Sequence, residues 1–144
     1  MKKILIFTAL LFISFTGFGQ SKLENWPELK TFHSVMASTF HPSEEGNLEP
    51  IKTRAGEMVE KAQALAASKI PAEFATDKIK AAVAKLVTGS QELKTIIDKK
   101  EKDEVITKNL SALHDTFHEI VGLCMHPEGE KHDHKEGEKH EHKE

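Results

Sequence analysis

Four apolar stripes constrain the fold of this chain more than any other feature of the sequence. In each stripe the apolar residues recur in steps of three and four, which places them on one face of an α-helix. No segment shows the alternation of apolar and polar residues that is typical of a strand. The stripes are Leu23, Trp26, Leu29, His33, Met36 and Phe40; Ile51, Ala55, Met58, Ala62 and Leu65; Ile79, Val83, Leu86, Ser90, Leu93 and Ile97; and Ile106, Leu110, Leu113, Phe117, Ile120 and Cys124.

The segments between the stripes are short, so we expect consecutive helices to be antiparallel. The first helix is predicted over about residues 23–40, and Pro50, with Asn47 nearby, suits the start of the second. Thr76 and Asp77 suit the start of the third. The sequence therefore predicts an all-α, up-down-up-down four-helix bundle over residues 21–126, in which the first and fourth helices are antiparallel neighbours packed at about 20°.

The first twenty residues have the pattern of a secretory signal peptide. Lys2 and Lys3 precede an apolar run that is short for a membrane span, and small residues follow it; a retained anchor is the alternative. No cysteine stands directly after the run, which argues against a lipoprotein anchor, so we expect a periplasmic or secreted protein without a stable membrane span. Removing this segment moves the formal charge from −3 to about −5, which argues against a nucleic-acid partner. Cys124 is the single cysteine, and we expect a buried, inert thiol.

Residues 127–144 differ in kind from the bundle. Residues 128–136 and 136–144 form a near-perfect repeat without any apolar residue, so we expect this tail to be disordered. Each repeat contains one His-x-His pair, His132 with His134 and His140 with His142. Such a tract can bind copper, nickel or zinc weakly; the alternative is a charged tail that aids solubility.

Two helices carry candidate metal ligands. His114 and His118 are spaced i, i+4, so both imidazoles leave one side of the fourth helix and can share an ion. His33 lies within the first apolar stripe, and alignment of the helix ends places it opposite His114, with Met36 one turn further on. Three imidazoles and a thioether would suit copper, and imidazoles alone would suit zinc. The alternatives are a solvated surface pair, and a core histidine bonded to an ordinary acceptor with methionine as filling.

His41 ends the first predicted helix. It could reach the same site or bind metal together with Glu45 at the end of the bundle. The alternative is a histidine that interacts favourably, when protonated, with the C-terminal end of the helix dipole.

Residues 110–117 read Leu-Ser-Ala-Leu-His-Asp-Thr-Phe, and residues 33–36 read His-Ser-Val-Met. The first segment resembles the Cys-x-x-Cys-His motif of the cytochrome c′ family and its b-type four-helix relatives, with leucine in place of both cysteines. The second resembles the basic residue of that family with a methionine one turn on. This resemblance implies a four-helix bundle and a homodimer as one oligomeric state. It places His114 at the haem-ligating position but allows no covalent haem c, whereas Met36 with His118 or His114 would imitate the axial ligands of haem b.

Three functions stay open at this point. The sequence favours a metal-binding protein for copper or zinc; the alternatives are an electron carrier with non-covalent haem, and a cofactor-free helical interaction module. Catalysis is not expected, because the chain has no Gly-rich phosphate loop, nucleophile elbow, HExxH motif or paired Glu-x-x-His motifs.

Overall fold

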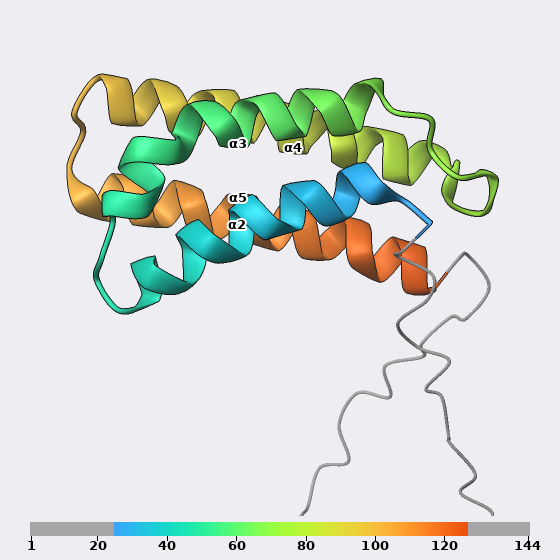
Figure 1. Cartoon of the computed structure of the whole chain (residues 1–144), viewed down its shortest axis with the longest axis horizontal. Helices are drawn as coiled ribbons and strands as arrows, with labels where there is room; N and C mark the ends of the chain where they lie inside the picture. Colours follow the sequence, from blue (N-terminus) through green and yellow to red (C-terminus); the bar gives the residue numbers. More distant parts are fainter. Residues whose placement is uncertain (1–24, 127–144) are drawn as a thin grey trace, which may run out of the picture.

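A computed structural model describes residues 25–126, which fold into four antiparallel helices. They are α2 (Pro27–Glu44), α3 (Glu49–Ala67), α4 (Asp77–Asp98) and α5 (Asp103–Met125), with a short 3₁₀ helix, η1 (Ala72–Phe74), before α4. No strand occurs between residues 25 and 126. The helices run alternately in opposite directions, with α2 and α5 side by side below α3 and α4 (Figure 1). The predicted up-down-up-down four-helix bundle is therefore confirmed.

The bounds of α2 differ from those expected. Trp26 caps the helix, because its carbonyl oxygen accepts bonds from the N–H groups of Leu29 (3.1 Å) and Lys30 (3.2 Å). The helix continues through Pro42, which lies in its last turn, and ends at Glu44. Proline lacks an N–H donor but its fixed φ is helical, so it ends this helix only after a further half-turn. Both ends of α2 therefore lie about four residues later than the sequence predicted.

The starts of α3 and α4 follow the predicted capping. The N–H of Glu49 donates to Asn47 Oδ1 (3.1 Å) at the start of α3, where Pro50 lies in the first turn. The N–H of Ile79 donates to Thr76 Oγ1 (3.2 Å) at the start of α4. These side chains satisfy backbone donors that have no partner within the helix.

The core lies where the stripes of α3 and α5 predicted it, since every residue of both stripes is buried. In α4, Gly89 permits a close approach of α5, because a Cβ there would lie 3.1 Å from Leu113 Cδ1. Trp26 closes one end of the core, where its Nε1–H donates to Ser68 Oγ (2.9 Å) and its ring stacks on Phe74.

Within residues 25–126, no helix combines the length and the apolar character needed to cross a bilayer. The expected signal peptide, residues 1–20, and the expected tail, residues 127–144, lie outside the described residues.

Candidate metal centre

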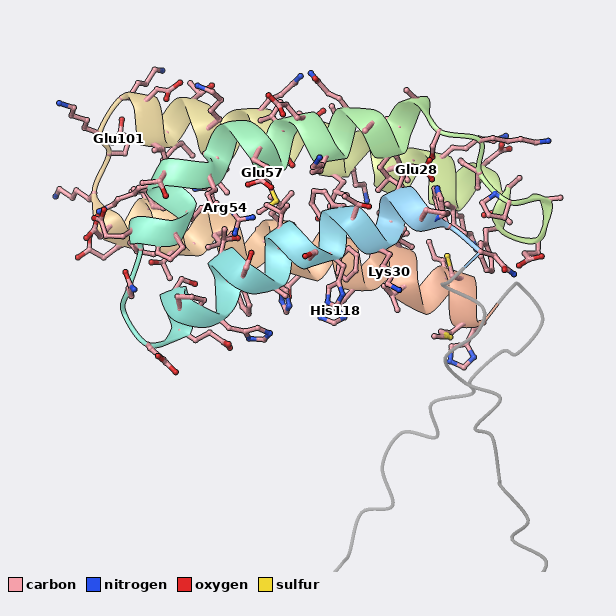
Figure 2. All side chains as sticks on the ribbon, viewed as in Figure 1. Glu28, Lys30, Arg54, Glu57, Glu101 and His118 are labelled. Carbon is pink, nitrogen blue, oxygen red and sulfur yellow. The ribbon has the colours of Figure 1, made fainter. Side chains whose placement is uncertain are left out.

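Helices α2 and α5 together carry a cluster of histidine and phenylalanine rings, which we call the His–Phe patch. Figure 2 shows His118 on the edge of the molecule formed by these two helices. Ring contacts join all members of the patch, directly or through a neighbour. The patch consists of His33, Phe40 and His41 from α2 and His114, Phe117 and His118 from α5.

The imidazoles of His114 and His118 meet at the centre of the patch. Their Nε2 atoms are 3.1 Å apart, and their rings are nearly perpendicular, with centroids 4.4 Å apart. When both rings are neutral, one Nε2–H donates to the other Nε2. His114 is half-buried and His118 is exposed, so the two nitrogens face each other at the protein surface. The predicted i, i+4 juxtaposition is confirmed.

Two phenylalanines hold these imidazoles in place. Phe40 of α2 stacks face to face on His114, with ring centroids 3.7 Å apart and an interplanar angle of 9°. Phe117 meets His118 edge to face at 5.7 Å, and it also stacks on Phe32 inside the bundle at 5.9 Å. Each imidazole of the pair therefore has an aromatic neighbour that restricts its rotation.

Burial and mutual repulsion favour the neutral form of two histidines in the patch. Burial lowers the pKa of His114, and the nearby His118 lowers it further, whereas Asp115 and Glu44 act to raise it. Partial desolvation of its ring also lowers the pKa of His33, with smaller contributions in the same direction from His118 and His41. A lowered pKa favours the neutral imidazole, which is the form that binds a metal ion.

His41 has a carboxylate partner within its own helix. Its Nδ1 lies 3.0 Å from Glu44 Oε2, and both side chains are largely exposed. A proton on Nδ1 that is donated to Glu44 leaves the Nε2 lone pair of His41 free to accept a bond or a cation. The carboxylate next to His41 is that of Glu44, one turn along the helix, whereas the sequence suggested Glu45 as a metal ligand together with His41.

The expected burial of His33 is wrong, because its side chain is exposed and Phe32 occupies the interior position instead. Its ring lies parallel to that of Phe117 at 4.9 Å, so His33 lies beside Phe117 and His118, while Phe40 lies opposite His114. Phe32 takes the interior position because burial of a phenylalanine ring is favourable, whereas an imidazole loses its hydration there.

Met36 does not join the surface pair. Its side chain is fully buried in the core. Coordination of an ion or of haem iron by Met36 together with His118 would therefore require the core to open. Within residues 25–126, no group of three or more His, Cys, Asp or Glu side chains is arranged to hold a metal ion. The histidine pair thus offers two ligands, and any further ligand must come from a rearrangement or from elsewhere.

Cys124 behaves as the sequence predicted. It is fully buried, and burial raises the pKa of its thiol to about 11, so the thiol stays protonated and is a poor ligand. The predicted tail ligands His132, His134, His140 and His142 lie outside the described residues.

The sequence did not predict the phenylalanine rings that pack against the histidines. Phe40 and Phe117 read as ordinary members of apolar stripes, although each precedes a histidine, His41 and His118 respectively. Phe40 is half-buried and Phe117 is buried, and the histidine that follows each of them was the signal available for the patch.

The chain matches no protein-family model, no curated protein and no solved structure.

Proposed function

We propose that this chain is an exported metal-binding protein that binds copper or zinc through His114 and His118. The 3.1 Å separation of the two Nε2 atoms carries the proposal. An ion about 2.05 Å from both nitrogens would subtend an N–metal–N angle of about 98°, which lies between square-planar and tetrahedral coordination. An ion would replace the hydrogen bond between the two Nε2 atoms, and both imidazoles would turn their lone pairs towards it.

Support also comes from the surroundings of the pair. Phe40 restricts the ring of His114, so less side-chain freedom is lost when an ion binds. The lowered pKa of His114 favours its neutral ligand form at neutral pH. Imidazole nitrogens suit zinc and copper, and we assign binding rather than catalysis to this site.

The proposal also takes in the predicted signal peptide and the histidine-rich tail. A periplasmic or secreted protein with His-x-His pairs in its tail would bind metal ions outside the cytoplasm, for storage or delivery.

Titration of the purified full chain with Zn²⁺ and with Cu²⁺, followed by calorimetry, tests the proposal. We expect His114→Ala and His118→Ala each to weaken the tightest site, because each removes one of two ligands on the same ion. His126→Ala is the matched control, since His126 is exposed at the end of α5 and outside the patch.

Binding curves that are unchanged in both His114→Ala and His118→Ala would remove the pair from the site. A Soret band in the natively purified protein would instead identify the haem-binding alternative. Absence of any bound metal after titration would favour a cofactor-free interaction module.

A further inference from the structure

The histidine pair leaves the coordination of an ion incomplete. Zinc prefers four ligands in a tetrahedral arrangement, and the pair supplies two. Since His118 is exposed on the outer edge of the molecule (Figure 2), the open positions on the ion would face away from the core. Between residues 25 and 126, no third His, Cys, Asp or Glu is placed to fill them. A second pair of imidazoles in the same arrangement would complete the tetrahedral site.

The pair lies in the middle of a stripe on the solvent side of α5. Ser111, Asp115, His118 and Gly122 follow one another in steps of four and three, and His114 borders them, so the five residues share one side of the helix, which we call the α5 face. The residues at its two ends are small, and a Cβ at Gly122 would meet nothing within 4 Å. Helices approach each other most closely where the side chains between them are small, so a second helix can come close to the pair.

Two copies of the α5 face match each other when the helices are antiparallel. A twofold axis through the ion then relates the two copies, and the same residues supply both sides of the contact. His114 of each copy lies opposite His118 of the other, and Ser111 lies near Gly122 of the other. The two pairs therefore meet at the axis, where they present four imidazoles to one ion.

A groove on the same side of the molecule gives the second copy room. It has a volume of about 670 Å³ and lies between the N-terminal half of α5 and the loop before α3, with Leu48 and Thr107 in its lining. Across the twofold axis, residues 121–125 of the second copy lie opposite residues 107–111. Val121 and Met125 are half-buried apolar residues of that segment, so the end of one α5 can pack over the groove of the other copy.

Asp115 makes this contact depend on metal. It lies beside the midpoint of the pair and is exposed, so two copies bring two carboxylates close to the axis. Without a cation these carboxylates repel each other, whereas one Zn²⁺ held by neutral imidazoles carries the two positive charges that balance them. Charge thus favours separate chains without metal and paired chains with it.

We propose that two copies of this chain share one Zn²⁺ ion, bound by His114 and His118 of both copies, with their α5 faces packed antiparallel. This inference rests on the proposed function of the pair. Binding displaces only protons and water, so no redox step is involved. The dimer forms when chains outnumber ions; in excess zinc, the pair of each chain holds an ion of its own and the copies separate.

Sedimentation velocity of the full chain tests this dimer, with Zn²⁺ as the probe. The parent protein carries His→Asn changes at 132, 134, 140 and 142, so that these histidines do not compete for the probe. The pair variant adds His114→Asn and His118→Asn. The face variant adds Gly122→Gln, which places a long neutral side chain on the α5 face, and its matched control adds Gly56→Gln on α3, where the added side chain also meets open space. Circular dichroism checks that every variant keeps its helix content.

We expect the parent to be monomeric without metal, dimeric at half an equivalent of Zn²⁺ and monomeric again at a several-fold excess. The pair variant should stay monomeric throughout. Gly122→Gln should weaken the zinc-dependent dimer by about 10-fold or more through a clash between the copies, yet still bind one ion per chain in excess zinc. Gly56→Gln should dimerise as the parent does.

Two results would overturn the dimer while leaving the proposed function intact. One is a parent that binds zinc through the pair but stays monomeric at half an equivalent. The other is a zinc-dependent dimer that persists in the pair variant or keeps its strength with Gly122→Gln, because the copies would then meet elsewhere. If calorimetry finds the same zinc affinity in the pair variant as in the parent, both proposals fail together.

Discussion

The zinc affinity of the His114–His118 pair should fall less steeply with acid than that of two ordinary imidazoles. Protons and metal ions compete for the same ring nitrogens. The pKa of His114 is lowered, first by burial and then by His118. A lowered pKa means that His114 stays in its neutral ligand form to a lower pH, so competition by protons begins later in an acid titration.

Imidazoles with the ordinary pKa give the fall in zinc affinity with which the prediction is compared. An imidazole with a pKa of 6.5 goes from about 9% protonated at pH 7.5 to about 91% at pH 5.5, so one such ligand lowers the apparent affinity by about 10-fold. Two independent imidazoles of this kind would lower it by about 100-fold over the same range. Because the pKa of His114 is lowered, we expect a fall smaller than 100-fold.

Competitive titration of zinc against a calibrated chelating dye, from pH 7.5 to pH 5.5 in a non-coordinating buffer, measures this fall. The parent protein for the experiment carries His→Asn changes at 132, 134, 140 and 142, so that only the bundle is titrated. Adding Phe40→Ala to this parent removes the ring that covers His114, raises its pKa towards the ordinary value and makes the fall steeper. A fall of 100-fold or more in the parent, or the same fall with Phe40→Ala, would refute the reasoning.

Three further predictions concern the bundle itself. Gly56→Ala should raise the free energy of unfolding in urea by about 1 kcal/mol, because its added Cβ meets nothing within 4 Å. Gly89→Ala should raise it less, because its Cβ would press on Leu113, and equal gains in stability would contradict the close approach of α4 and α5. Cys124 should react with a thiol reagent only after unfolding, since its pKa is raised to about 11, and rapid labelling of the native protein would contradict its burial. Trp26→Phe should cost about 2 kcal/mol in free energy of unfolding, because the smaller ring leaves a void and cannot donate the indole hydrogen bond; a change within 0.5 kcal/mol would contradict this.

Much of the fold could be predicted from apolar spacing. The stripes of α3 and α5 are buried at every position, because apolar residues are spaced so that only one helical face could enter the core. The buried face of the first helix was ambiguous, since Phe32 and His33 both lie three or four residues from Leu29 and from Met36. Burial of a phenylalanine ring is favourable, whereas an imidazole loses its hydration, so Phe32 takes the interior position.

The site was predictable only where it depends on one helix. The spacing of His114 and His118 fixes their juxtaposition within α5 whatever the rest of the fold does. The packing of α2 against α5 depends on which residues of α2 are buried, and periodicity could not choose between Phe32 and His33. The stacking of Phe40 on His114 depends on that packing and could therefore not be predicted.

Phe117 is shared between the interior and the surface, since one ring contacts Phe32 inside the bundle and both His33 and His118 outside it. A substitution at Phe32 therefore alters the position of the Phe117 ring that packs against two exposed imidazoles, although Phe32 itself contacts neither of them through its ring. Transfer of the His114–His118 spacing to another helical scaffold would reproduce the two imidazoles but not the phenylalanine ring that packs against them. During divergence of the sequence, the interior ring and the surface histidines would be expected to change together rather than independently.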